Sequence, residues 1–187
     1  MRTTPFFDND VVIAIAGRSG AGKSTLARSL AESLQTRQVG FGDYIRSLSG
    51  KLHGHAELTA LQAKGHELAS TDPNSFANEF LLWAEKKGPF GIIEGLRHVS
   101  VAKALRSALE EREREMLVLY VDTERELRAF RRTGGDLQRL AVIDQHPVEG
   151  EVENLAAHAD LLIDGMSDLN EVLAHINASD ALFRSRR

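Results

Sequence analysis

The chain has 187 residues, of which 42% are hydrophobic and 27% charged, as in an ordinary globular protein. The chain has no cysteine, which excludes disulfides, thiolate metal sites and thiol catalysis. Its formal net charge of −4 disfavours nucleic-acid binding, so a small anionic ligand is the expected partner. No apolar run approaches the about 18 residues that span a membrane, and residues 1–10 lack the pattern of a signal peptide, so we expect a cytoplasmic protein without a membrane partner.

Apolar runs alternate with helical periodicity along the chain. We expect strands at 11–16, 38–42, 90–94, 116–122 and 160–164, and helices at 23–34, 100–113, 123–132 and 168–176, with a polar, helix-rich stretch over 44–87 and a frayed tail over 178–187. Within the polar stretch, Asp72 is an expected N-cap and Pro73 the first helical residue. This order predicts one α/β domain over 1–187, a three-layer α/β/α fold with a five-stranded parallel sheet.

The turn between the first strand and the first helix carries a phosphate-binding motif, here called the phosphate loop: Gly17-Arg18-Ser19-Gly20-Ala21-Gly22-Lys23-Ser24, followed by Thr25. Its glycines let successive backbone N–H groups point inward around an anion, at the positive end of the following helix. Lys23 can supply charge to the β- and γ-phosphates, and the Ser24 hydroxyl can ligate Mg²⁺. We therefore expect the loop to bind Mg·ATP; the alternative is a glycine-rich turn without a ligand.

Other motifs narrow the class of nucleotide-binding protein. A GTPase needs a guanine-reading Asn-Lys-x-Asp segment, which the chain lacks. An ABC-type ATPase needs Leu-Ser-Gly-Gly, which the segment 48–51 does not supply.

Two further segments resemble those of P-loop nucleotide kinases. Residues 94–97, Glu-Gly-Leu-Arg, resemble the Asp-Gly-x-x-Arg segment of adenylate-kinase-like enzymes, and residues 42–46 resemble their Gly-Asp-x-x-Arg segment. Residues 61–76 and 92–98 are similar to deoxynucleoside-monophosphate kinase-like and dephospho-coenzyme A kinase-like proteins, and residues 146–149 and 159–164 also suit that group. The resemblance spans about 11–176. It departs from the pattern in having Glu94 in place of Asp, no proline before Arg97, and no Arg-rich adenylate kinase lid.

The resemblance implies an ATP-dependent kinase that transfers the γ-phosphoryl of Mg·ATP to a small molecule. The acceptor is expected to be a nucleoside monophosphate or a similar phosphorylated molecule bound under the helices of 44–87, with a lid at about 128–147. Two alternatives stay open. The acceptor could be a hydroxyl of a coenzyme A precursor or a sugar, or the chain could be a non-catalytic ATP-binding switch. The sequence does not indicate an oligomeric state.

Polar residues at the expected strand ends are the candidate site residues, because ligands bind at the carboxyl edge of parallel sheets. Asp43 could accept a proton or hold a water on Mg²⁺, or be the N-cap of a helix starting at Tyr44. Arg46 and Arg97 could each grip an acceptor phosphate. Glu94 is expected near Mg²⁺, or as a hydrogen-bond partner of the phosphate loop.

The helix expected at 123–132 carries Arg125, Arg128 and Arg132 on one stripe, opposite Leu127 and Phe130. A Gly-Gly break and a polar segment follow, a pattern typical of a mobile lid. We expect Arg128 or Arg132 to reach the transferring phosphoryl group, as a catalytic residue.

The histidines give weaker expectations. His98 is interpreted as a loop histidine, and His146 and Glu149 either touch the substrate or start the next helix. His53, His55 and His66 have no acidic or thiol partner in the pattern, so a polar helical surface is favoured over a metal site.

Overall fold

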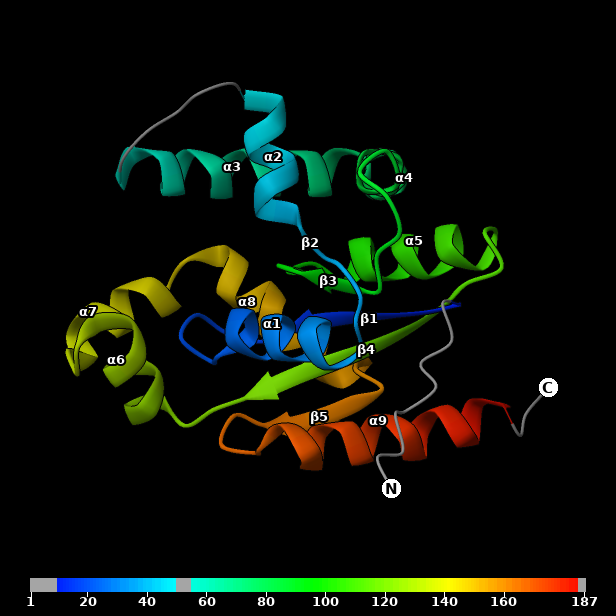
Figure 1. Cartoon of the computed structure of the whole chain (residues 1–187). Helices are drawn as coiled ribbons and strands as arrows, with labels where there is room; N and C mark the ends of the chain where they lie inside the picture. The colour runs from blue at the N-terminus through cyan, green and yellow to red at the C-terminus, as the bar shows by residue number, and fades with distance from the viewer. Residues whose placement is uncertain (1–9, 50–54, 185–187) are drawn as a thin grey trace.

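The sheet has five parallel strands in the order β2-β3-β1-β4-β5 (Figure 1). The computed structural model describes residues 10–49 and 55–184. The strands are β1 (Val11–Ala16), β2 (Gln38–Gly40), β3 (Ile92–Glu94), β4 (Glu115–Asp122) and β5 (Leu161–Asp164). In the centre, Ala14 of β1 is in register with Ile93 of β3 on one side and Val118 of β4 on the other. The predicted parallel α/β fold is confirmed.

A helix follows each of the five strands. They are α1 (Lys23–Ser33), α2 (Phe41–Ser49), α3 (His55–Thr71), α4 (Pro73–Glu85), α5 (Val99–Glu110), α6 (Arg125–Thr133), α7 (Leu137–Asp144), α8 (Pro147–Asn154), a 3-10 turn (Leu155–His158) and α9 (Leu169–Arg184). The predicted cap of α4 is confirmed, since the Asp72 carboxylate accepts hydrogen bonds from the N–H groups of Asn74 and Ser75. Gly134 ends α6 in the left-handed conformation.

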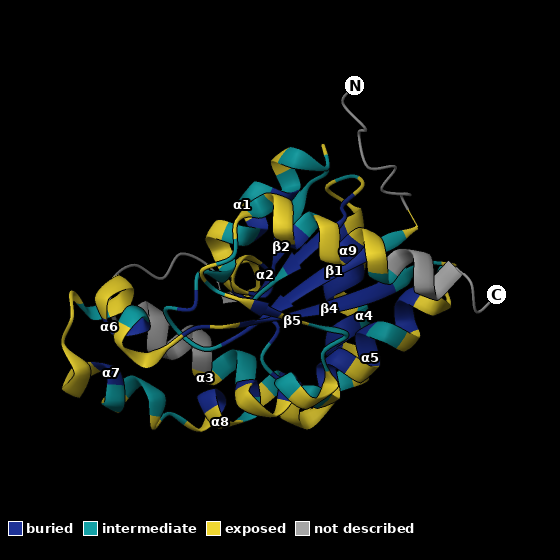
Figure 2. Cartoon of the chain, turned by 90° about the horizontal axis from the view of Figure 1, so that it is seen from below, coloured by how far each residue is buried: buried dark blue, intermediate teal, exposed yellow. Residues whose placement is uncertain are grey.

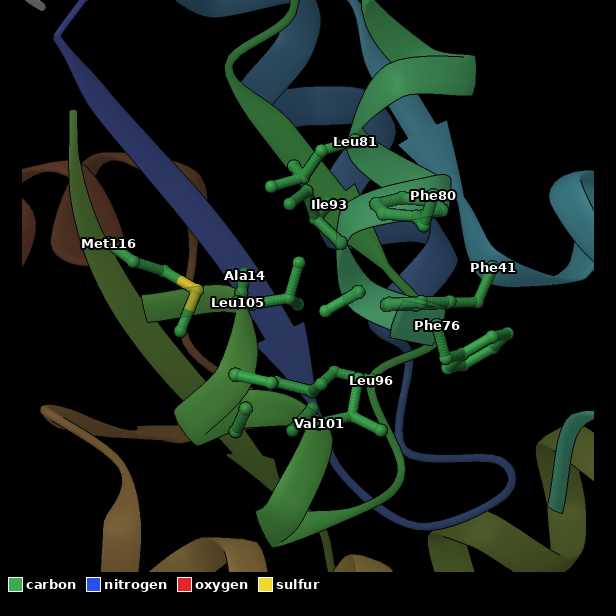
Figure 3. Close-up of a cluster of buried hydrophobic side chains, with 14 of the residues drawn as sticks. Ala14, Phe41, Phe76, Phe80, Leu81, Ile93, Leu96, Val101, Leu105 and Met116 are labelled. Atoms are coloured by element: carbon green, nitrogen blue, oxygen red, sulfur yellow. The ribbon is translucent and has the colours of Figure 1, made fainter. Parts of the chain in front are cut away.

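The sheet separates two apolar cores, because β1 is buried on both faces (Figure 2). Val12, Ala14 and Ala16 face a core built with α4, α5 and α8, part of which appears in Figure 3. Ile13 and Ile15 face a second core, built with α1 and α9. The three predicted layers are therefore present. None of the helices in the described part of the chain is long and apolar enough to cross a membrane.

Three local expectations were wrong. The segment after α6, expected to be a polar stretch as far as Pro147 with no helix assigned to it, forms α7, and α8 follows from Pro147. Their short, half-apolar turns bury Leu140, Val148 and Val152 against neighbouring elements, a tertiary effect that periodicity does not reveal. The helix expected to start at Tyr44 begins at Phe41, so Asp43 lies in the first turn of α2 and is not its N-cap. The tail expected to fray from residue 178 continues α9 as far as Arg184.

Candidate functional site

The phosphate loop turns from the end of β1 into α1 with three glycines at positive φ, namely Gly17 (140°), Gly20 (83°) and Gly22 (98°). Two of these positions also lack room for a side chain. A Cβ at Gly17 would lie 2.5 Å from the carbonyl oxygen of Val121, and one at Gly20 would lie 2.7 Å from that of Arg128. Only glycine fits both the backbone conformation and the space, so the loop has the tight curvature that an anion nest requires.

Lys23, the first residue of α1, folds its side chain back over the loop. Its ammonium donates a hydrogen bond to the carbonyl oxygen of Arg18 at 2.7 Å. Burial, followed by the positive charge of Arg97, lowers the pKa of Lys23 to about 8, while Glu149 and Glu94 act in the opposite direction. The ammonium therefore stands in a charged cluster built from several elements.

Two cavities flank the phosphate loop. The first, which we call the Arg97 cavity, holds about 350 Å³ and lies between the loop, α2, α3 and the start of α5. The second, the Arg131 cavity, holds about 480 Å³ and lies between the loop, α6 and the turn from β5 to α9. Gly20, Lys23 and Ser24 line both cavities. The motif lysine therefore borders both cavities.

The lining of the Arg97 cavity is partly polar and partly apolar. Its polar and charged residues include Lys23, Ser24, Arg46, Glu94, Arg97 and Arg132, and its apolar residues include Phe41, Ile45, Phe76, Val101 and Val148. Phe41 and Phe76 stack with ring centroids 5.3 Å apart and belong to the apolar cluster of Figure 3, so the cavity wall continues into the core. Such a cavity suits a ligand with an anionic part and an apolar or aromatic part.

The predicted strand-end residues come together at this cavity. Gly40 of β2 is in register with Glu94 of β3. A Cβ at Gly40 would lie 3.4 Å from the Oε1 of Glu94 and 3.6 Å from the Oδ2 of Asp43, so two carboxylates flank this point. Arg46 donates a hydrogen bond to the Asp43 carboxylate. The grouping of Asp43, Glu94, Arg46 and Arg97 follows from the shared carboxyl edge of β2 and β3.

Arg97 is held by a buried partner. Its Nη1 donates to the Oε1 of Glu149 at 3.0 Å, and the Oε2 of Glu149 accepts the Ser19 N–H, also at 3.0 Å. The Glu149 side chain is 2% exposed. The sequence left two roles open for Glu149, namely contact with the substrate or the start of a helix. It lies in the first turn of α8, and it also contacts the phosphate loop.

The arginine stripe of α6 is divided between two environments. Arg128 is 3% exposed. It donates to both carboxylate oxygens of Asp144, at 3.0 and 2.5 Å, and to the carbonyl oxygen of Ser19 at 3.1 Å. Arg128 therefore connects α6 to the phosphate loop and to α7. Arg132 lines the Arg97 cavity, whereas Arg125 lines a separate surface depression together with Arg18 and Asp144. Of the two predicted lid arginines, Arg132 is the one that faces the cavity.

Arg131 was not singled out from the sequence. Its Nη1 donates to the carbonyl oxygen of Ala21 at 3.2 Å and its Nη2 to that of Gly165 at 3.1 Å, joining the phosphate loop to the turn after β5. Thr123 also bonds the loop, donating to Ala21 at 3.0 Å. The rule that ligands bind at strand ends would have pointed to Gly165, which follows β5 directly.

Two histidines line the Arg97 cavity. His98 is 8% exposed, and its ring centroid lies 5.1 Å from that of His66. Burial of the ring is the largest cause that lowers the pKa of His98 below its ordinary value, and the charges of His66 and Arg97 also lower it. The charge of Glu151 acts in the opposite direction. His66 lies on α3 as a half-buried residue, and it lines the cavity. His146 accepts a hydrogen bond from Val148 N–H and caps α8. His53 and the side chain of His55 lie outside the described residues.

Comparison with known proteins adds a family and a fold. Residues 2–133 match the family model described as Zeta toxin. The adenylate kinases of Rickettsia africae (strain ESF-5) and Rickettsia conorii (strain ATCC VR-613 / Malish 7) are each 29% identical over 122 residues, which is 63% of this chain and 54% of theirs. The chain thus spans about half the length of the curated relatives it matches.

Solved structures agree on the fold. Shikimate kinase from Aquifex aeolicus vf5 superimposes with a TM-score of 0.55 at 19% identity, covering 91% of this chain and 98% of that one. Shikimate kinase from Acinetobacter baumannii in complex with shikimate gives 0.54 at 19% identity, covering 95% and 96%. The resemblance to P-loop kinases predicted from the sequence is confirmed.

Proposed function

The chain belongs to the Zeta toxin family, and from this premise we propose that it is an ATP-dependent small-molecule kinase. The observation that carries the proposal is that Gly20, Lys23 and Ser24 line both cavities. A phosphoryl transfer needs donor and acceptor on either side of the transferring group, roughly in line. The Arg131 cavity would take the nucleoside of ATP and the Arg97 cavity the acceptor, with the transferring phosphoryl above Lys23.

The protein's own groups would act by position and charge. The inward N–H groups of the phosphate loop and the Lys23 ammonium would hold the phosphates, and Arg97 and Arg46 would orient the acceptor. Arg132, on the wall of the same cavity, would neutralise charge that develops during transfer. Arg131 would hold the donor side between Ala21 and Gly165.

Mg²⁺ fits the residues present. Ser24 and Glu94 line the same cavity, and within the described ranges no three His, Cys, Asp or Glu side chains form a cluster that could hold a metal. Mg²⁺ usually keeps several waters and binds through one or two protein oxygens plus substrate phosphates, which matches a site of this kind. When bound, the ion would neutralise charge on the β- and γ-phosphates.

We propose a phosphorylated nucleoside or a similar nucleotide-like molecule as the acceptor. Arg46, Arg97 and Arg132 line the Arg97 cavity, more cation than an uncharged hydroxyl requires. Phe76 and the tilted ring pair of His66 and His98 line it as well, and a planar ring could lie against them. The second candidate is a hydroxyl acceptor, as in a sugar or coenzyme A precursor. The carboxylates of Asp43 and Glu94 beside Gly40 favour it, since a hydroxyl needs a proton acceptor.

The test is a coupled assay for ADP release with Mg·ATP and a panel of nucleoside monophosphates, dephospho-coenzyme A and shikimate, with Lys23→Ala as the control. Turnover with a nucleoside monophosphate supports the favoured acceptor. Turnover only with dephospho-coenzyme A or shikimate assigns the hydroxyl alternative. Tight ATP binding without turnover on any acceptor would identify a non-catalytic switch and overturn the kinase proposal.

A further inference from the structure

Glu149 contacts one group on each side of the proposed reaction centre. Its Oε2 accepts the Ser19 N–H of the phosphate loop at 3.0 Å, and its Oε1 accepts Nη1 of Arg97 at 3.0 Å. Both carboxylate oxygens are thus engaged, and the side chain is 2% exposed. Its negative charge also acts on Lys23 and Arg128. A single carboxylate on α8 therefore balances cations around the loop residues that line both cavities.

The partners of Glu149 are groups that the proposed reaction assigns to phosphates. Ser19 belongs to the loop whose N–H groups would cradle ATP, and Arg97 is the proposed acceptor arginine. A carboxylate and a phosphoryl group both present oxygens that accept charge-assisted hydrogen bonds from N–H and guanidinium donors. They cannot take the same donors together, and two anions at one site repel each other.

We infer that Glu149 is an internal phosphate mimic, which holds the phosphate loop and Arg97 in the unliganded protein and is displaced when phosphates bind. The inference rests on the proposed function. An acceptor phosphate that takes over Arg97 would release one oxygen of Glu149 and so ease the loss of the other to the terminal phosphate of ATP. Acceptor and ATP would then bind with positive coupling, which is reciprocal by linkage. Glu149 is thus a positioning residue that makes the complete site depend on both substrates.

The anchor of Glu149 suits this role. It lies two residues after Pro147 in the first turn of α8, and its N–H donates to the carbonyl oxygen of His146 at 2.8 Å. Val148 and Val152 of the same helix are buried in the core. Displacement therefore requires only rotation of the Glu149 side chain, or a small shift of a helix of eight residues.

The test compares a non-hydrolysable ATP analogue with a terminal phosphoryl, AMP-PNP, against ADP, each with Mg²⁺, by calorimetry. Glu149→Gln keeps the shape and an accepting oxygen but removes the charge. The variant should bind AMP-PNP more tightly by roughly tenfold, within the 5–150-fold usual for coupled sites, and bind ADP nearly as the wild type does. Glu110→Gln is the control, because it removes the same charge from an exposed side chain on α5 that lines neither cavity.

Other outcomes are decisive. An equal change for AMP-PNP and ADP, or weaker binding of both, would make Glu149 a structural support of the loop and overturn the inference. A wild type that binds neither nucleotide would remove the proposed function itself, which is a distinct result. Should Glu149→Gln fold poorly, Glu149→Ala offers a second readout. The increase in Tm on saturation with AMP-PNP should be larger in this variant than in the wild type, and a smaller increase contradicts the mimic.

Discussion

Lys23 donates a hydrogen bond from its ammonium to the carbonyl oxygen of Arg18 at 2.7 Å, across the loop to which both residues belong. Burial, followed by the charge of Arg97, lowers the pKa of Lys23 to about 8. The surroundings of Lys23 therefore disfavour its charged form in the unliganded protein. A bound anion beside the ammonium would favour that charged form.

Removal of this buried charge should stabilise the unliganded protein. Since the folded pKa of about 8 lies below the ordinary value of 10.5, the folded state disfavours the proton and its stability rises with pH between these values. Below pH 8 the full cost of the ammonium is present. We expect Lys23→Met to raise the stability near pH 7 by on the order of 1–3 kcal/mol, since one pKa unit corresponds to about 1.4 kcal/mol.

Thermal melts of both proteins near pH 7 and pH 10 measure this effect. The Tm advantage of Lys23→Met should shrink as pH rises through the window, because the wild type then sheds its proton in the folded state. Lys64→Met is the control, since Lys64 is a half-exposed lysine paired with Glu67 on α3. A Tm difference for Lys23→Met that does not depend on pH would refute the burial argument.

The same residue should be essential for transfer. Lys23→Ala keeps the glycine geometry of the phosphate loop but loses the charge that would face the phosphates, so we expect a folded protein with kcat reduced by ~10²–10³-fold. Circular dichroism checks the fold and the coupled assay checks the rate. Near wild-type turnover would remove Lys23 from its assigned role.

Arg97→Met should weaken acceptor binding far more than ATP binding. Hydrogen bonds to charged groups contribute about 1.5–3 kcal/mol, so we expect a roughly 10–100-fold rise in the acceptor Kd, measured by calorimetry for each substrate separately. The substitution also leaves Glu149 without its cation. The double variant Arg97→Met with Glu149→Gln should therefore be more stable than Arg97→Met alone. An equal loss of ATP affinity would assign Arg97 to the donor side.

Sequence pattern predicted those features that local rules determine. The apolar run of β1, the glycines of the phosphate loop and the Asp72 cap each depend on neighbours in the chain. The gathering of Asp43 and Glu94 was also predictable, because parallel strands end at one edge of the sheet.

Other features depend on packing between distant segments. Glu149 contacts Ser19 across 130 residues of sequence, and only the fold determines that α8 reaches the phosphate loop. Arg128 and Arg132 lie one helical turn apart with the same residue type, yet one is buried against Asp144 and the other lines the cavity. Helical periodicity placed both arginines on one face of α6. It predicts the direction of a side chain around the helix axis, but not which neighbouring element the side chain contacts at each turn.

Arg131 should contribute to the donor side alone. It bridges Ala21 and Gly165 on the wall of the Arg131 cavity, so Arg131→Ala should raise the Kd of ATP and ADP together, by roughly 10–100-fold if one charged hydrogen bond of about 1.5–3 kcal/mol is lost. This equal effect separates Arg131 from Glu149, for which ATP and ADP should differ. Arg28→Ala, at an exposed position of α1, is the control. Unchanged nucleotide affinity would argue against a nucleoside in the Arg131 cavity.

The arginines of α6 give the sharpest prediction, because their surroundings differ although their chemistry is the same. Arg132→Ala should lower kcat by ~10²–10³-fold with the ATP Kd nearly unchanged, if Arg132 acts only on the transition state. Arg128→Ala should chiefly destabilise the fold, by roughly 1–3 kcal/mol, because the half-buried Asp144 carboxylate loses both hydrogen bonds from Arg128 and retains the ion pair with Arg18 at 3.7 Å. Asp144→Asn in the same chain should restore part of that loss. Arg125→Ala should be mild, since Arg125 is exposed and faces away from the Arg97 cavity. Measuring kcat, ATP Kd and Tm for the single variants separates the cases. A raised ATP Kd with intact kcat in Arg132→Ala would make Arg132 a ground-state clamp, and near-normal activity in all of them would end the lid hypothesis.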